Sequence, residues 1–144
     1  MKTFDECLRG GWLKKTHPDI QKAHKALESA EHNLKLSENA FEHGIYESAF
    51  IHAYTSMFHS ARALVFRDGY VERGHFALTI FLKENYSSFI AEKYISQLDS
   101  MREMRHRVIY GDEELNIKEV QETEADSAIK IAAGFLDSVK KLIN

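Results

Sequence analysis

The stretch Ser100–Gly111, SMREMRHRVIYG, lies in a predicted helix whose apolar face is interrupted by charged side chains. At about 100° of rotation per residue, Arg105 projects into the middle of this face, and Arg102, His106 and Tyr110 follow its flank. An arginine held against a core needs an anionic or hydrogen-bonding partner, because a buried unpaired charge is costly. We expect this partner to be a carboxylate of the fold, a second subunit or a phosphate. The apolar residues that define the face recur at helical spacing: Ile90, Ala91, Tyr94, Ile95, Leu98, Met101, Val108 and Ile109.

Length and composition predict one globular domain over residues 1–144, with 44% hydrophobic and 28% charged residues. A net charge of −3 argues against a protein that coats nucleic acid non-specifically, although a local basic patch stays possible. Cys7 is the only cysteine, which excludes an intrachain disulfide and fits a reducing compartment. No apolar run approaches the roughly 20 residues of a membrane span, and the start of the chain lacks the apolar core of a signal peptide. We therefore expect a cytoplasmic protein with no membrane partner.

The sparse glycines and the single proline are typical of an all-α chain, and they set the expected helix boundaries. The third helix is apolar on more than one face, which predicts either the central helix of the bundle or a subunit interface. Asn116 and Glu119 are expected to form a capping box for the last helix, with Leu115 and Val120 as its hydrophobic staple. No strand is expected. The helices before the last are expected at 4–8, 18–44, 45–67, 75–84, and from Ser87 or Ser88 to Gly111.

The basic cluster also has a purely structural explanation. Cations near a helix C-terminus are favoured by the dipole by about 0.3–1 kcal/mol, and this accounts well for Arg107. It accounts poorly for Arg105, whose position is on the apolar face and not at the helix end. A buried ion pair between Arg105 and a carboxylate is the structural alternative that remains open.

Other motifs add little. The eight histidines show no HExxH or comparable spacing, so scattered structural histidines are favoured over a metal site, and no cofactor is expected. His59 and Arg62, three residues apart on the third helix, are possible supporting residues for the Arg105 cluster, although a hydrogen bond at the edge of the core explains His59 equally well. The acidic run Asp112-Glu113-Glu114 is read as a solvated loop that could instead pair with the basic helix end.

Four stretches of the sequence occur in a recognisable order: CLRGGWL, AYTSMFHSARALVFRDGY, ERGHFAL and MREMRHRVIYG. In that order they resemble the HEPN superfamily (higher eukaryotes and prokaryotes nucleotide-binding domain), and specifically its small stand-alone prokaryotic members. The resemblance covers nearly the whole chain and implies an antiparallel bundle of four to five main helices that forms a homodimer. It also implies a neighbouring minimal nucleotidyltransferase as the antitoxin-like partner of a toxin–antitoxin pair.

In that superfamily an arginine is followed by a histidine some four to six residues later, and active members cleave RNA without a metal. This chain departs from the pattern, because three residues separate Arg102 from His106 and Arg105 directly precedes His106. It matches a variant with tyrosine in the last place, Arg105 and then Tyr110. In some relatives the partner transferase attaches a nucleotide to the corresponding tyrosine, so the resemblance implies Tyr110 as a candidate acceptor.

Three functions follow as hypotheses. The first is a metal-independent, toxin-like endoribonuclease in which His106 is the base, Arg102 or Arg105 stabilises the phosphate charge, and a second subunit closes the cleft. The second is a non-catalytic nucleotide-binding module that partners a minimal nucleotidyltransferase. The third is a plain dimeric bundle whose arginines form interface ion pairs.

Overall fold

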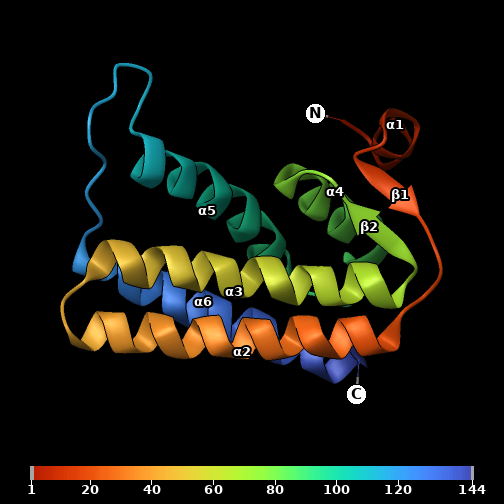
Figure 1. Cartoon of the computed structure of the whole chain (residues 1–144), viewed down its shortest axis with the longest axis horizontal. Coiled ribbons are helices and arrows are strands. Elements are labelled where there is room, and N and C mark those ends of the chain that lie inside the picture. The colour runs from red at the N-terminus through yellow and green to blue at the C-terminus, as the bar shows by residue number, and fades with distance from the viewer. Residues whose placement is uncertain (1, 144) are drawn as a thin grey trace.

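Three long helices form the body of the protein in the computed structural model, which describes residues 2–143. Helix α2 (Ile20–Glu42) and helix α3 (Tyr46–Arg67) lie antiparallel and side by side, and α6 (Glu122–Ile143) covers them from behind (Figure 1). Asp19 caps α2 by accepting a hydrogen bond from the Lys22 amide at 2.9 Å. Gly44, with φ of 73°, takes the left-handed conformation that lets the chain reverse into α3.

Helix α3 is the central helix, and it is buried along most of its length. Two hydroxyls fix its register against α2, because each satisfies a backbone carbonyl of the other helix. Ser56 Oγ donates to the Ala30 carbonyl at 2.8 Å, and Ser37 Oγ donates to the Ala49 carbonyl at 2.5 Å. Met57 in the middle of this helix is fully buried within the protomer, so it is not available for the subunit interface that the apolar pattern left open.

A two-stranded ribbon lies at one end of the bundle, and its presence corrects the prediction of a strand-free chain. Strand β1 (Leu13–Lys15) pairs antiparallel with β2 (Tyr70–Glu72), with Leu13 opposite Glu72. Each strand has three residues, too few to show an alternating pattern, so the pairing depends on tertiary structure alone. The ribbon connects α1 (Phe4–Gly10), which Thr3 and Glu6 open with a capping box, to α4 (His75–Tyr86).

Helix α5 (Glu92–Tyr110) crosses α3 obliquely and rises away from the bundle toward its C-terminal end (Figure 1). The predicted start at Ser87 or Ser88 is wrong, because the amides of Phe89 and Ile90 both turn back to the Tyr86 carbonyl after α4. Ile90 is therefore buried in the core, as the apolar spacing suggests, but it lies before α5 and not within a helix. Gly111 ends α5 as predicted, with φ of 80°.

The connection from α5 to α6 also differs from the prediction. Asn116 does not cap a helix; its amide and side chain donate to the Asp112 carboxylate, which organises a local turn. Leu115 is 81% exposed and forms no staple with Val120. Helix α6 instead begins at Glu122, where the Glu124 carboxylate accepts from the Gln121 amide at 2.9 Å.

The predicted all-α bundle is confirmed, since the three long helices, α4 and α5 contribute to one contiguous core. Within residues 2–143, none of the helices combines the length and the apolar composition that crossing a bilayer requires.

Candidate functional site

The C-terminal half of α5 is the least embedded part of the helix. Ile95, Leu98 and Met101 are its only buried side chains in the described part of the chain, so the packed face ends at Met101. Beyond it, Met104 and Val108 are half-buried, while His106, Ile109 and Tyr110 are exposed. The four predicted site residues therefore lie on a helix that is anchored at one end and solvent-accessible at the other.

Arg105 lies against an aromatic ring and not against an acid. Its guanidinium carbon is 5.8 Å from the ring centroid of Tyr54, a residue of α3 that is almost fully buried. Arg105 itself is half-buried, and within residues 2–143 no carboxylate forms an ion pair with it. A carboxylate of the same protomer, one of the three expected partners, is therefore not what holds this charge.

Arg102 is in the opposite situation, because its charge is balanced within α5. Its Nε and Nη2 atoms donate to the Asp99 carboxylate at 3.2 and 3.0 Å, and Glu103 lies 3.8 Å away. The side chains of Arg102 and Asp99 are both partly exposed, so the pair holds the guanidinium in place without hiding it.

The rings of His106 and Tyr110 contact each other one turn apart at the exposed end of the helix, with centroids 4.8 Å apart and planes tilted by 46°. Together with Arg102 they line an open depression of about 700 Å³ between α5 and the loop that follows it. Arg105 does not line this depression. The predicted cluster is thus divided, because Arg102, His106 and Tyr110 line the depression whereas Arg105 lies against Tyr54.

Arg62 and His59, the possible supporting residues, lie on α3 near the side of Arg105. Arg62 forms an ion pair with Glu72, and its guanidinium lies over the Phe58 ring at 5.2 Å. His59 is half-buried against the edge of Phe58, and burial, followed by the charge of Arg62, lowers its pKa. Within residues 2–143, neither side chain forms a hydrogen bond or ion pair with Arg105.

Two residues that the spacing did not single out lie between these groups. The Tyr54 hydroxyl hydrogen-bonds Nδ1 of His75 at 2.7 Å, and the His75 ring stacks on Phe58 with centroids 4.2 Å apart. Burial is the main cause that lowers the pKa of His75, and Arg105, Arg102, Arg62 and His59 lower it further. His75 therefore senses the arginines of both α3 and α5. It could not be found from sequence, because it opens a different helix.

The acidic loop does not neutralise the basic helix end. Hydrogen bonds from Asn116 to the carboxylate lower the pKa of Asp112. Within the described residues no ion pair joins Asp112, Glu113 or Glu114 to an arginine. This carboxylate thus stabilises its own turn, in agreement with the solvated-loop interpretation.

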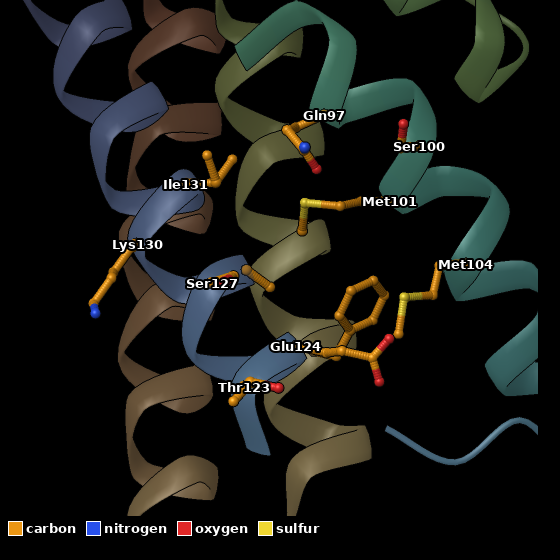
Figure 2. A pocket seen from close by; sticks show the side chains of 11 residues that line it. Gln97, Ser100, Met101, Met104, Thr123, Glu124, Ser127, Lys130 and Ile131 are labelled. Atoms are coloured by element: carbon orange, nitrogen blue, oxygen red, sulfur yellow. The ribbon is translucent and has the colours of Figure 1, made fainter. Parts of the chain in front are cut away.

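A second hollow, of about 550 Å³, lies between α5 and α6 (Figure 2). Phe50 of α3 also lines it. Its walls are mixed, with Met101, Met104 and Ile131 beside polar side chains such as Gln97 and Glu124. None of the predicted site residues lines it. Across residues 2–143, no group of three or more His, Cys, Asp or Glu side chains is arranged to hold a metal ion.

Comparisons with known proteins agree with this architecture. Residues 23–142 match the family model described as "HEPN domain". The chain is also 29% identical over 126 residues to a protein of Methanocaldococcus jannaschii named "Putative toxin MJ0605". That alignment covers 87% of this chain and 92% of the relative.

Proposed function

The chain belongs to the HEPN family, and from this premise we propose that it is a toxin-like member that binds RNA through α5 and cleaves it without a metal. The likeness to a protein named as a toxin supports the first part. We further propose that residues 1–144 are one HEPN-like domain, since one contiguous core links α1 to α6. RNA as the ligand implies a cytoplasmic place of action.

The observation that carries the proposal is the uncompensated charge of Arg105. A half-buried guanidinium that lies on an aromatic ring and has no acidic partner within residues 2–143 keeps its donors for a ligand. Guanidinium groups bind phosphate oxygens through paired, charge-assisted hydrogen bonds. An RNA phosphate thus supplies the anion that this position lacks.

The proposed chemistry is an attack of the RNA 2′-hydroxyl on the adjacent phosphate. His106 accepts the hydroxyl proton, because imidazole is the side chain that most often serves as a general base and this side chain is exposed beside the depression. Arg102 or Arg105 stabilises the negative charge that develops on the phosphate. The departing 5′-oxygen takes up a proton from solvent water, leaving a 2′,3′-cyclic phosphate and a free 5′-hydroxyl.

One protomer does not bring Arg105 into the depression that the other groups line, so we propose that a second copy completes the cleft. Helix α3 is buried within the protomer, whereas α5 leaves Ile109 and Tyr110 exposed, and the loop exposes Leu115 and Ile117. A two-fold axis near the end of α5 covers these apolar side chains and brings one Arg105 toward the partner's depression.

A second candidate function has its own observation. Tyr110 is 60% exposed, and its side chain lies in a depression beside Arg102 and His106. A partner nucleotidyltransferase, acting as the antitoxin, reaches such a hydroxyl and transfers to it the nucleotidyl group of a nucleoside triphosphate, with pyrophosphate as the leaving group and loss of the hydroxyl proton. In this alternative the protein is a non-catalytic module, and modification of Tyr110 is its measurable property.

The test is incubation of the purified protein with labelled tRNA and mRNA in EDTA. We expect cleavage by the parent chain and none by Arg105→Ala. Arg9→Ala, which removes an exposed arginine of α1, is the matched control and should cleave like the parent. Intact RNA with the parent chain, together with nucleotide transfer to Tyr110 when a nucleotidyltransferase is added, favours the second candidate.

A further inference from the structure

We propose that Tyr54 and His75 extend the site into the junction of α3, α4 and α5, where Nε2 of His75 donates a hydrogen bond to a nucleotide phosphate. The inference rests on the proposed function for its ligand, a phosphate group held by Arg105 and Arg102. It adds two residues that lie outside the arginine and histidine pattern of α5.

Tyr54 is the element that joins the two sides of the junction. Its ring lies under the guanidinium of Arg105 at 5.8 Å, and its hydroxyl contacts Nδ1 of His75 at 2.7 Å. The two rings are also close to parallel, with an interplanar angle of 16°. Because Tyr54 is only 1% exposed, it is fixed by the core, and it fixes Arg105 and His75 relative to each other.

We infer from this hydrogen bond which nitrogen of His75 carries the proton. Burial raises the pKa of Tyr54 to about 12, so the phenol stays protonated, and a phenol is the stronger donor toward an imidazole nitrogen. Nδ1 therefore accepts and Nε2 carries the hydrogen. Nε2 has no hydrogen-bond partner in the described part of the chain, and the side chain is partly exposed. This leaves one N–H for a ligand.

Charge at the junction favours an anion. Glu72 balances Arg62 and Asp99 balances Arg102, while Arg105 has no counter-ion among residues 2–143. The junction therefore carries one excess positive charge in a partly buried setting. A neutral imidazole suits this place, because it donates a hydrogen bond without adding repulsion to the arginines. His75 also begins α4, so the positive end of that helix dipole lies at the same place.

The direct test measures the NMR chemical shifts of the imidazole nitrogens in ¹⁵N-histidine-labelled full-length protein during titration with AMP, with inorganic phosphate as a second probe. We expect the chemical shift of His75 Nε2 to change and to reach a plateau as AMP saturates the site. His52 is the matched control, because it is also partly buried with Nδ1 engaged, by Asn33 Oδ1 at 2.9 Å, but near α2. An unshifted His75 while calorimetry shows AMP bound overturns the inference, and so does an equal shift of both histidines.

Variants give a second readout. His75→Leu removes the donor and should weaken AMP binding about tenfold or more, the usual loss for one hydrogen bond to a charged group. His75→Gln keeps a neutral N–H and should recover part of this loss. Tyr54→Phe should also weaken binding, because it frees Nδ1 to take the proton. His52→Leu should bind AMP like the parent. Parent-like affinity in a folded His75→Leu overturns the inference; if His75→Leu does not fold, the titration of the parent decides.

Failure of this inference can be told apart from failure of the proposed function. If RNA stays intact but AMP shifts His75 and Arg105→Ala abolishes the shift, cleavage is wrong and the phosphate site stands. If Arg105→Ala stops RNA cleavage while His75→Leu and Tyr54→Phe cleave like the parent, the function stands and the role of His75 and Tyr54 is wrong.

Discussion

The guanidinium of Arg105 lies over the ring of Tyr54, 5.8 Å from its centroid, and this contact joins the exposed helix α5 to the core helix α3. Such a cation–π contact is worth about 0.5–2 kcal/mol, depending on how far the charge is desolvated. It leaves the hydrogen-bond donors of the arginine unused, unlike an ion pair. Arg105 therefore makes a structural contact while its donors stay available for the ligand that we propose.

We predict that Arg105→Ala lowers the free energy of unfolding by only about 1 kcal/mol, because one cation–π contact is lost. Its affinity for RNA and AMP should fall far more, since the uncompensated charge is removed. Thermal unfolding and calorimetry on the same sample measure both effects. A large loss of stability with unchanged affinity would show that Arg105 is a structural residue and that the site assignment is wrong.

The periodicity of the sequence was sufficient to predict the helical bundle, but it left open whether α3 is the central helix or a subunit interface, and the structure shows the central helix. The predicted helix boundaries were wrong where a local hydrogen bond, which the spacing of apolar residues does not reveal, decides where the helix begins. Ile90 continues the apolar spacing of α5, yet the chain turns there because two amides bond back to Tyr86. Asn116 and Glu119 have the spacing of a capping box, but Asp112 captures Asn116 first.

The candidate site was predictable only in the part that lies on one helix. Arg105 stood out because a charge on an apolar face violates the helical pattern, and Arg102, His106 and Tyr110 share its helix. His75 lies 21 residues from Tyr54 and opens α4, so no spacing rule relates them. A site built across helices needs the tertiary structure, and a residue that serves both core and site looks like an ordinary core residue in sequence.

His106→Ala should separate catalysis from binding. The substitution removes the proposed base, so RNA cleavage in EDTA should be lost. Binding should change little, because the arginines that hold the phosphate are untouched. Filter binding of RNA at several salt concentrations checks the second point, and the affinity of both chains should weaken steeply with salt. Cleavage that survives in His106→Ala assigns the base to another residue.

Arg62→Ala should destabilise the fold more than Arg105→Ala does. The Glu72 side chain is only 5% exposed, and removing Arg62 leaves its carboxylate buried without a counter-ion. Such a loss costs about 3–5 kcal/mol, and we expect the lower end because Arg62 is itself 29% exposed. Chemical denaturation measures the change. The double variant Arg62→Ala/Glu72→Gln is the control, and it should recover part of the stability because the buried charge is gone.

Acidification should destabilise the protein through its partly buried histidines. Burial, as the main cause, lowers the pKa of His52, His59 and His75 below the ordinary value of about 6.5. The unfolded chain then binds more protons than the folded one, so stability falls as the pH drops through about 6.5 and below. Denaturant unfolding from pH 7 to 5 should show this slope, and His75→Gln should make it shallower. An unchanged slope in that variant contradicts the neutral state of His75.

The composite cleft makes a prediction that a site within one protomer does not. If Arg105 of one copy acts with His106 of the other, Arg105→Ala and His106→Ala are each inactive alone, because both sites of each homodimer lack one group. In a mixed dimer one site loses both groups and the other keeps both. Random mixing of equal amounts makes half of the dimers mixed, so about a quarter of the parent activity should return.

The measurement is RNA cleavage after the two single variants are mixed and allowed to exchange subunits. In the control, each single variant is mixed with the inactive double variant Arg105→Ala/His106→Ala, and these mixtures should not cleave RNA. Light scattering at tens of micromolar comes first, since a monomer there removes the composite cleft. If the mixture stays inactive although mixed dimers form, the two groups act within one protomer and the separation of Arg105 from the depression has to be bridged by the RNA itself.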